Sequence, residues 1–310
     1  MRRAVWVGGS RFELDESAIP EVTPGALRVR IHACGVCMTE VHRTEGLLES
    51  TPPYVMGHEW VGTIEATASD DPRFAVGATV AGVGRGAFAE QMVVPAEYAF
   101  PMPAGVPLDA GTFVEPLACC IAAVNAIPVR PGGTALVTGA GPMGQVVAQL
   151  ARQAGARVLV SEPDPVRRAL ALQLGAEVVI DPSNESLADA ATAFSGGNGI
   201  DIAWETAGRP SPLADCLAAL RNGGAAVIVG VNPTDTQFQI PLYHFHFRNL
   251  TLHGSYGARD PINIGKAVAK LADMNLGPLV SHRFGLADIE EAFEVARLGR
   301  GLKVLVEPTR

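Results

Sequence analysis

The second half of the chain alternates short β-branched runs with helical stretches, and this alternation constrains the fold more than any other feature. The runs are Thr134–Thr138, Arg157–Glu162, Glu177–Asp181, Ile200–Glu205, Ala225–Val231 and Leu250–Gly254. The helical stretches between them are Met143–Ala154, Pro165–Leu174, Leu187–Phe194 and Pro212–Leu220. Strand–helix alternation at this spacing predicts a parallel, doubly wound sheet with helices on both faces.

The rest of the sequence follows a different pattern. Before residue 125, short strands are separated by Gly/Pro turns with few helical periods, which favours an antiparallel β domain. These strands are Gly25–Ala33, Val61–Glu65 and Phe88–Val94. The C-terminal part returns to helices and a final strand, at Asn263–Met274, Ala287–Leu298 and Leu302–Glu307. We therefore predict an α/β protein with a β-rich domain at 1–124 and 258–310 and an inserted nucleotide-binding domain at 125–257.

A glycine-rich turn follows the first run of the inserted domain: Gly139-Ala140-Gly141-Pro142-Met143-Gly144. The first glycine permits the tight turn, the second lets the backbone approach a pyrophosphate, and the third lets the helix pack on the strand. The unpaired N–H groups of the helix that follows face the phosphates. Because a strand precedes the turn and a helix follows it, we predict a dinucleotide site. Its predicted contacts are Gly139, Gly141, Pro142, Met143 and Gly144.

An acidic residue, Glu162, ends the second run. A carboxylate at this place can accept hydrogen bonds from the adenosine ribose hydroxyls and repels a 2′-phosphate, so we expect NAD rather than NADP. Arg167 and Arg168 lie close by in the sequence and leave NADP open. We also assign Arg167 to the cofactor site, together with Gly230 and Val231 at the end of the fifth run.

The composition argues against several classes of partner. The chain has 310 residues and a formal net charge of −8, whereas binding to nucleic acid requires a basic face. No basic amphipathic segment suggests membrane attachment. The long uncharged stretches Pro116–Val129 and Pro131–Ala151 are interrupted by Gly, Pro, Asn or Gln, and the N-terminus has no signal-peptide core. The five cysteines form no regular disulfide framework. We expect a soluble, cytoplasmic protein that binds neither nucleic acid nor membranes.

Three separate segments carry potential metal ligands: Cys34–His42, Gly57–Glu59 and Glu115–Leu117. The pair Cys34-x-x-Cys37 alone could be a redox pair or half of a structural zinc site. A structural site of four cysteines needs a second spaced pair, and Cys119 and Cys120 are adjacent. A catalytic zinc instead requires three protein ligands of mixed Cys, His and carboxylate type, with one open position.

Together these motifs resemble those of the zinc-containing medium-chain dehydrogenase/reductase family, the alcohol dehydrogenase family, over essentially the whole chain. The matching pieces are Gly35–Cys37 with Thr39 and His42, Gly57–Glu59, Glu115–Leu117, Gly139–Gly144, Glu205–Gly208 and Gly254–Gly257. The resemblance implies a GroES-like catalytic domain joined to a Rossmann cofactor domain. Because the third segment carries Glu and not Cys, the site is similar to that of the sorbitol, threonine and glucose dehydrogenase branch.

The resemblance also implies which residues hold the metal. Cys37 and His58 would be zinc ligands, and the remaining ligand would be Glu59 or Glu115, because zinc in this family can shift between the two acids. Many family members carry an additional lobe with a structural zinc, but here Val80–Gly86 runs directly into Ala87 and that lobe is missing. We therefore predict one zinc per chain. Because the lobe commonly lies near subunit contacts or the substrate cleft in the family, the resemblance does not carry over the quaternary structure or the shape of the pocket.

Other roles follow from matching positions. Thr39 would accept the proton of the substrate hydroxyl and pass it through the cofactor ribose to His42, whose pKa range suits a terminal base. Glu40 would orient the zinc-bound histidine. Lys303 would lie close to the cofactor phosphates. We interpret the histidines of the segment His244-Phe245-His246 as part of an edge or loop before the last sheet strand.

The sequence therefore predicts an NAD- and zinc-dependent oxidoreductase that transfers a hydride between a secondary alcohol and NAD. Glu59, Thr39 and His42 would carry the chemistry on a polyol, sugar or amino alcohol. One alternative is a zinc-independent NAD(P)H reductase of quinones or enones on the same fold, and another is a non-catalytic nucleotide-binding protein. The resemblance further implies a homodimer or homotetramer.

Overall fold

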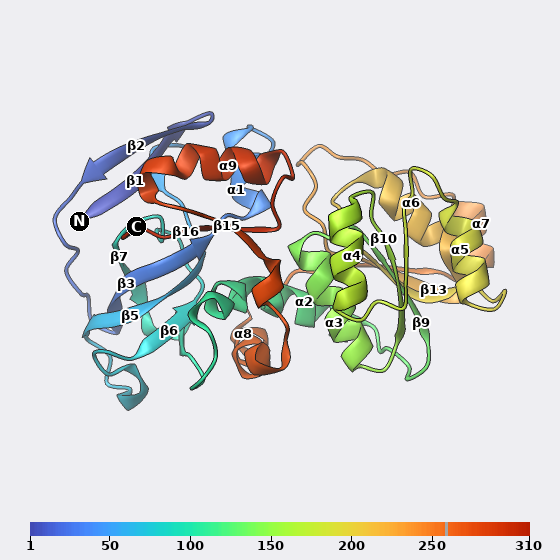
Figure 1. The fold of residues 1–310 in the computed structure, drawn as a ribbon, viewed down its shortest axis with the longest axis horizontal. Helices are drawn as coiled ribbons and strands as arrows, with labels where there is room; N and C mark the ends of the chain where they lie inside the picture. The colour runs from blue at the N-terminus through green and yellow to red at the C-terminus, as the bar shows by residue number, and fades with distance from the viewer. Residues whose placement is uncertain (258–259) are drawn as a thin grey trace. The chain divides into compact units, whose positions relative to one another are not determined.

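The computed structural model describes residues 1–257 and 260–310 and separates the chain into two compact units (Figure 1). One unit comprises Met1–Ala118 and Ala258–Arg310, and the other comprises Cys119–Gly257. The division between them falls inside helix α2 (Val114–Ala126). Each unit builds its own sheet and its own hydrophobic core.

The second unit contains a six-stranded sheet in the order β11-β10-β9-β12-β13-β14, with every neighbouring pair parallel. Its strands are β9 (Thr134–Thr138), β10 (Arg157–Ser161), β11 (Val178–Ile180), β12 (Ile200–Glu205), β13 (Leu220–Ile228) and β14 (Thr251–Gly254). Its helices after α2 are α3 (Pro142–Gln153), α4 (Pro165–Gln173), α5 (Leu187–Phe194), α6 (Pro210–Ala219) and α7 (Leu242–Phe247). Counted from β9, this is the 3-2-1-4-5-6 order of dinucleotide-binding sheets. The predicted doubly wound parallel sheet is confirmed.

Burial explains why these runs become strands. Leu136, Leu159, Ile200 and Ala226 are buried at the centre of the sheet, where parallel strands covered on both faces need apolar residues throughout. The prediction for His244 and His246 was wrong, because both lie in helix α7. Phe245 packs against the core of this unit and its N–H donates to the Pro241 carbonyl oxygen at 3.0 Å, which stabilises one helical turn there.

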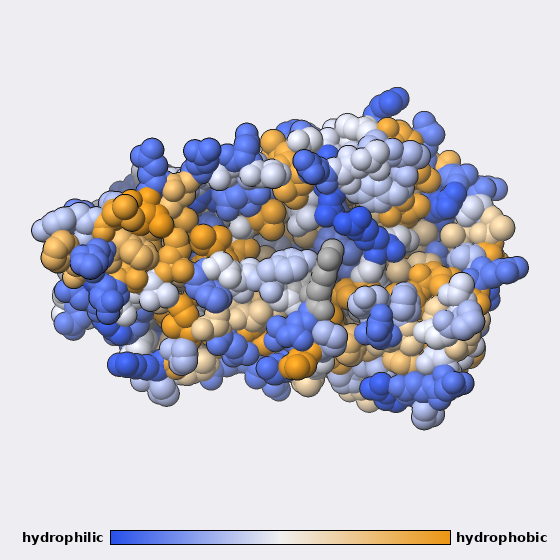
Figure 2. All heavy atoms as spheres, turned by 180° about the vertical axis from the view of Figure 1, so that it is seen from behind, coloured by the Kyte–Doolittle hydropathy of each residue, from blue (hydrophilic) through white to orange (hydrophobic). Residues whose placement is uncertain are grey.

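Helix α7 and strand β14 leave apolar and backbone groups uncovered within the described residues. Leu242, Tyr243 and Phe247 of α7 are 74%, 70% and 67% exposed. Strand β14 is the last strand of the sheet, so one of its edges has no neighbouring strand among the described residues. Figure 2 shows hydrophobic side chains gathered at the end of this unit where α7 lies.

The first unit is β-rich, as the sequence predicted. Its larger sheet has the order β15-β16-β3-β5-β6-β8, with β7 paired to β3, and a second sheet has the order β2-β1-β4. The strands are β1 (Arg2–Gly8), β2 (Arg11–Glu16), β3 (Ala26–Gly35), β4 (Tyr54–Val55), β5 (Glu59–Thr67), β6 (Thr79–Gly82), β7 (Gln91–Pro95), β8 (Ala99–Pro101), β15 (Val280–Phe284) and β16 (Lys303–Val306). The helices are α1 (Met38–Thr44), α8 (Pro261–Lys270) and α9 (Ile289–Arg297). All strand pairs are antiparallel except β15 with β16.

One end of the larger sheet gathers segments that are far apart in the sequence. Gly35, at the end of β3, pairs with Glu59 at the start of β5 and with Leu305 of β16. The Val36 N–H donates to the Val304 carbonyl oxygen at 2.9 Å, so β16 lies directly beside the segment that leads to Cys37. Two of the predicted metal-binding segments therefore meet at this end of the sheet.

One helical stretch, Leu108–Ala126, is long and apolar enough to span a membrane by length and composition alone. In the described structure 67% of this stretch is buried. Such burial is typical of a core helix.

Candidate metal centre and cofactor turn

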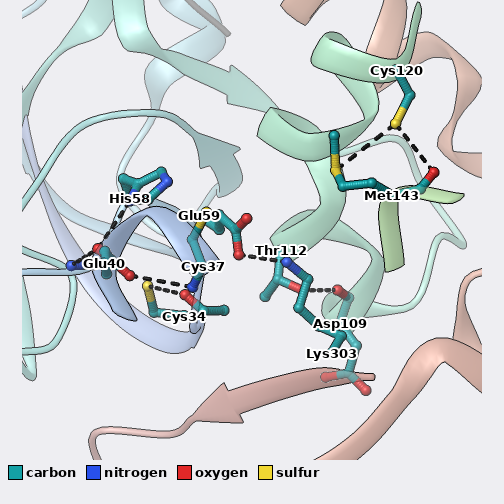
Figure 3. Close-up of polar contacts among 12 residues, drawn as sticks. Cys34, Cys37, Glu40, His58, Glu59, Asp109, Thr112, Cys120, Met143 and Lys303 are labelled. Atoms are coloured by element: carbon teal, nitrogen blue, oxygen red, sulfur yellow. Dashed lines mark hydrogen bonds and ion pairs between the residues drawn. The ribbon is translucent and has the colours of Figure 1, made fainter. Parts of the chain in front are cut away.

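Cys37, His58 and Glu59 lie together in the first unit, with one potential ligand atom of each within 4.8 Å of the others (Figure 3). Cys37 caps the N-terminus of α1, and Glu59 opens β5 directly after His58. Glu59 is buried, whereas Cys37 and His58 are half-buried. A thiolate, an imidazole and a carboxylate at this spacing are a donor set that suits zinc, and Cys37 and His58 are not fully buried.

Glu40 supports this cluster from behind. Its side chain is 2% exposed, and its Oε1 accepts from the Gly57 N–H at 2.7 Å and from His58 Nδ1 at 2.9 Å. Its Oε2 accepts from the Cys37 N–H at 3.4 Å. An ionised carboxylate only accepts, so His58 carries its proton on Nδ1 and leaves Nε2 for a metal when the ring is neutral. The predicted role of Glu40 in orienting His58 agrees with these contacts.

The pKa values around Glu40 reflect this pairing. Burial raises the pKa of Glu40, but the charge of His58 and the hydrogen bonds from His58, Gly57 and Cys37 outweigh it, so the pKa lies below its usual value. Burial lowers the pKa of His58, but Glu40 and Cys37 raise it well above its usual value in the metal-free protein. A metal ion at His58 must therefore displace a firmly held proton.

Lys303 reaches the cluster from β16. Its side chain is 4% exposed, and its Nζ lies 2.5 Å from Glu59 Oε2 and 5.3 Å from the centre of the Phe113 ring. The sequence indicated Lys303 as a contact of the cofactor phosphates. The structure pairs its ammonium group with Glu59, and the phosphate contact stays a prediction.

Glu115, the other predicted acid ligand, lies in the first turn of α2 and is half-buried. It does not join the group of three among the described residues. Burial raises the pKa of Glu115 to about 7, while the charges of His58 and Lys303 lower it and that of Glu59 raises it further. Glu115 is therefore electrostatically coupled to the cluster, and the choice between Glu59 and Glu115 as third ligand stays open.

Thr39 and His42 both lie in α1, three residues apart and so on the same side of the helix. The Nδ1 atom of His42 is buried and has no hydrogen-bond partner among the described residues. Burial lowers the pKa of His42, and the charge of Glu45 opposes this only in part. A buried ring nitrogen without a partner fits the predicted role of His42 as a base, which stays a prediction.

In the second unit, the glycine-rich turn has the geometry that its sequence predicts. Gly139 has a φ of +90°, and a Cβ on Gly144 would lie 2.0 Å from the Gly139 carbonyl oxygen, so helix and turn touch. A Cβ on Gly141 would meet nothing within 4 Å. Gly141 is the N-cap of α3, with Pro142 and Met143 as its first residues. The turn therefore leaves open space over a helix N-terminus, where a pyrophosphate fits.

Glu162 lies directly beneath this turn. It is 4% exposed, its Oε2 accepts from the Ala140 N–H at 2.6 Å, and its Oε1 accepts from the Asp164 N–H at 3.0 Å. Arg168 donates to the Glu162 carbonyl oxygen at 2.7 Å, and the Arg167 carbonyl oxygen accepts from Gln145 at 3.0 Å. The Glu162 carboxylate thus braces the turn and has further acceptor capacity. Its contact with the ribose stays a prediction, as does that of Arg167.

Glu205, at the end of β12, is a residue whose role the sequence reasoning missed. It is 1% exposed, and its Oε1 accepts from the Ala207 and Gly208 N–H groups, both at 2.7 Å. Burial raises the pKa of Glu205, and these hydrogen bonds oppose the shift. Its other oxygen has no partner among the described residues and would lie 3.0 Å from a Cβ on Gly230.

The turn after β12 is packed against both neighbouring turns. Thr206 donates to the Thr138 and Gly139 carbonyl oxygens at 2.9 and 3.0 Å. A Cβ on Gly208 would lie 2.6 Å from the Val231 carbonyl oxygen. The carboxyl ends of β9, β12 and β13 therefore form one hydrogen-bonded and closely packed surface. The Glu205–Gly208 motif marked this turn in the sequence. Its spacing alone does not show that the Glu205 carboxylate accepts from the N–H groups of its own turn.

Comparisons with known proteins agree with this geometry. Residues 23–104 match the alcohol dehydrogenase GroES-like domain, and residues 142–273 match the zinc-binding dehydrogenase family. The chain is 29% identical over 328 residues to L-threonine 3-dehydrogenase of Mesorhizobium japonicum, covering 95% of this chain and 94% of the relative. It is 31% identical over 334 residues to L-threonine 3-dehydrogenase of Pyrococcus horikoshii, covering 96% and 95%. A Sinorhizobium meliloti structure described as a zinc-binding dehydrogenase bound to NADP has a TM-score of 0.90 and 28% identity, with 99% of both chains covered.

The chain therefore belongs to the zinc-containing medium-chain dehydrogenase/reductase family, as its motifs indicated. It is an alcohol oxidoreductase that depends on zinc and on a nicotinamide dinucleotide. This assignment disfavours the zinc-independent reductase and the non-catalytic alternatives that the fold alone would permit.

Proposed function

We propose that this chain oxidises the secondary hydroxyl of an amino alcohol, polyol or sugar, with NAD as the hydride acceptor. The reaction takes place at a zinc site formed by Cys37, His58 and either Glu59 or Glu115. The observation that carries this proposal is the cluster of sulfur, nitrogen and oxygen donors with buried Glu40 behind His58. The similarity to L-threonine 3-dehydrogenases makes amino alcohols the first group to test.

The protein's own residues prepare the metal site. When bound, zinc would supply Lewis acidity that makes the proton of the substrate hydroxyl easier to lose, and the nicotinamide would supply the hydride acceptor. Glu40 holds His58 with its Nδ1 protonated, so that Nε2 is the ligand atom. Cys37 and Glu59 contribute negative charge to the site, and Glu59 is held in place by Lys303.

The proton leaves by way of α1 in this proposal. The Thr39 hydroxyl accepts it from the substrate hydroxyl and gives up its own proton in turn, and His42 is the terminal base that takes up a proton on its imidazole ring. The lowered pKa of His42, caused by burial and only partly opposed by the charge of Glu45, keeps the ring neutral at neutral pH and able to take up a proton. The buried Nδ1 of His42, without a partner among the described residues, supports this role.

The cofactor lies on the second unit in this proposal. The turn Gly139–Gly144 takes the pyrophosphate, and Gly230 and Val231 belong to the surface at the ends of the neighbouring strands. The negative charge of Glu162 beneath the turn favours NAD over NADP, because a 2′-phosphate would approach a carboxylate. The catalytic domain comprises residues 1–124 and 258–310 and the cofactor domain residues 125–257, with the boundary inside α2.

We further propose a cytoplasmic homodimer or homotetramer. The unpaired edge of β14 among the described residues and the exposed apolar side chains of α7 support association through the second unit.

The test is the formation of NADH by the purified protein on a panel of amino alcohols, polyols and sugars, repeated with NADP and repeated after chelation and return of zinc. We expect turnover on at least one group, lost on chelation, recovered with zinc, and faster with NAD than with NADP. Silence on the whole panel by protein that still holds zinc and binds NAD would contradict the proposed substrate class. Turnover that survives complete removal of zinc would contradict the mechanism.

A further inference from the structure

Lys303 is a buried cation at the edge of the candidate metal centre, where it pairs with the acid Glu59. Its side chain is 4% exposed and that of its partner Glu59 is 3% exposed, so water screens this pair very little. The Lys303 ammonium group thus lies inside the protein, paired with the Glu59 carboxylate.

The fold holds this cation in place closely. Lys303 is the first residue of β16, which pairs with β3 at Leu305 and Gly35. A Cβ on Gly35 would lie 2.3 Å from Glu59 Oε2 and 3.2 Å from Lys303 Nζ, so any side chain at position 35 would push the pair apart. The glycine that precedes Val36-Cys37 thus leaves space for the ion pair between Glu59 and Lys303.

The same carboxylate belongs to the group that could hold a metal. One oxygen of Glu59 lies within 4.8 Å of ligand atoms of Cys37 and His58, and its Oε2 lies 2.5 Å from the Lys303 ammonium group. A positive charge that shares a carboxylate with a metal ion withdraws negative charge from the metal and repels it directly. Lys303 therefore has two opposed effects. Its ion pair with Glu59 stabilises the fold, and its charge weakens the binding of a metal ion at the same carboxylate.

We propose that Lys303 is a positioning residue that competes with zinc for Glu59 and so limits the affinity of the site for the metal. This inference rests on the proposed metal site at Cys37, His58 and Glu59. Lys303 keeps Glu59 an exchangeable ligand, because the carboxylate always has a second cation to pair with. A lysine that only stabilised the fold would have the opposite effect, since its loss would loosen the site and release zinc faster.

The experiment measures the rate at which zinc passes from the purified holoenzyme to a coloured chelator in excess. The wild type is compared with Lys303→Met, which keeps the length and apolar character of the side chain, and with Lys303→Arg, which keeps the charge. We expect Lys303→Met to release zinc more slowly than the wild type, because no second cation then competes for the Glu59 carboxylate, and Lys303→Arg to resemble the wild type. Release from Lys303→Met at the wild-type rate or faster overturns the inference.

Two further variants separate this inference from the proposed site. Cys37→Ser must lose zinc, and if it retains zinc as the wild type does, the proposed metal site itself is wrong. If Lys303→Met does not fold, Lys303→Gln takes its place with the same expectation, because its amide can donate to Glu59 without a positive charge. In the Glu59→Gln background, replacement of Lys303 should slow zinc release less than in the wild type, and an undiminished effect overturns the route through Glu59.

Discussion

The carboxylate of Glu40 offers the sharpest test of how the protein prepares its metal ligand. Glu40→Gln keeps the size of the side chain and an oxygen that can accept from Gly57, but it removes the negative charge beside His58. Residues that orient a metal-bound histidine change metal affinity by about 10- to 100-fold when replaced. This range corresponds to about 1.4–2.8 kcal/mol. We expect a loss of zinc affinity within it for Glu40→Gln.

Glu40→Ala should act on the fold as well. It would leave the Gly57 N–H and the His58 Nδ1–H without an acceptor in the protein interior, where each unsatisfied group costs about 1–3 kcal/mol. The free energy of unfolding of the zinc-free protein should therefore fall by about 2–6 kcal/mol in Glu40→Ala and by less in Glu40→Gln.

The assay is a competition between the protein and a zinc chelator of known affinity, combined with urea unfolding of the zinc-free protein. Glu65→Gln is the matched control, because Glu65 lies in β5, the strand that begins at Glu59, but pairs with Arg30 and Gln91 and has a side chain 28% exposed. Wild-type zinc affinity in Glu40→Gln would show that the charge of Glu40 does not prepare His58 for the metal. An equal loss in Glu65→Gln would show that the effect is not specific to Glu40.

Three further predictions concern other buried groups. Because the pKa of Glu115 is raised from 4.5 to about 7 in the folded metal-free protein, this group holds more protons there than in the unfolded chain, so stability should fall as the pH rises from about 4.5 to 7. Replacement of Glu115 by Gln should remove this part of the pH dependence of the free energy of unfolding, measured with urea. An unchanged pH dependence would contradict the raised pKa of Glu115. Gly144→Ala should lower the thermal stability of the NAD-free protein because its Cβ overlaps the turn, whereas Gly141→Ala should leave that stability unchanged and weaken only the binding of NADH measured by fluorescence. Glu205→Ala should destabilise the protein by about 2–6 kcal/mol and raise the KM for NAD, with Glu205→Gln closer to the wild type, and a wild-type KM in both would refute its bracing role.

Much of the fold could be predicted because its signals are local. The runs that became β9, β10 and β12 carry nearly continuous apolar residues between turns. The glycines of the cofactor turn could be assigned from their spacing, because each position in that motif has a known geometric reason for glycine. Cys37, His58 and Glu59 could be grouped because each lies in a short motif of recognisable chemistry. In each case neighbours in the sequence carry the information.

Two kinds of contact could not be predicted. One joins residues on different strands of the sheet, and the other is a hydrogen bond from the backbone of a turn to a side chain of the same turn. The ion pair between Lys303 and Glu59 joins residues 244 positions apart, and it depends on β16 lying beside β3. The bracing by Glu205 depends on a rotamer that aims the carboxylate at the Ala207 and Gly208 N–H groups. In helix α7, Phe245 packs against the hydrophobic core, and the short aromatic segment has no local pattern that predicts this contact.

We propose that the metal required by this family is held by Cys37 with its neighbours at the end of the large sheet. The most direct measurement is the zinc content per chain of the purified wild type, of Cys37→Ser and of Cys34→Ser, where Cys34 is the buried other cysteine of the same Cys-x-x-Cys pair. We expect one zinc in the wild type, none in Cys37→Ser, and one in Cys34→Ser. A full zinc complement in Cys37→Ser, or its loss only in Cys34→Ser, would contradict this proposal.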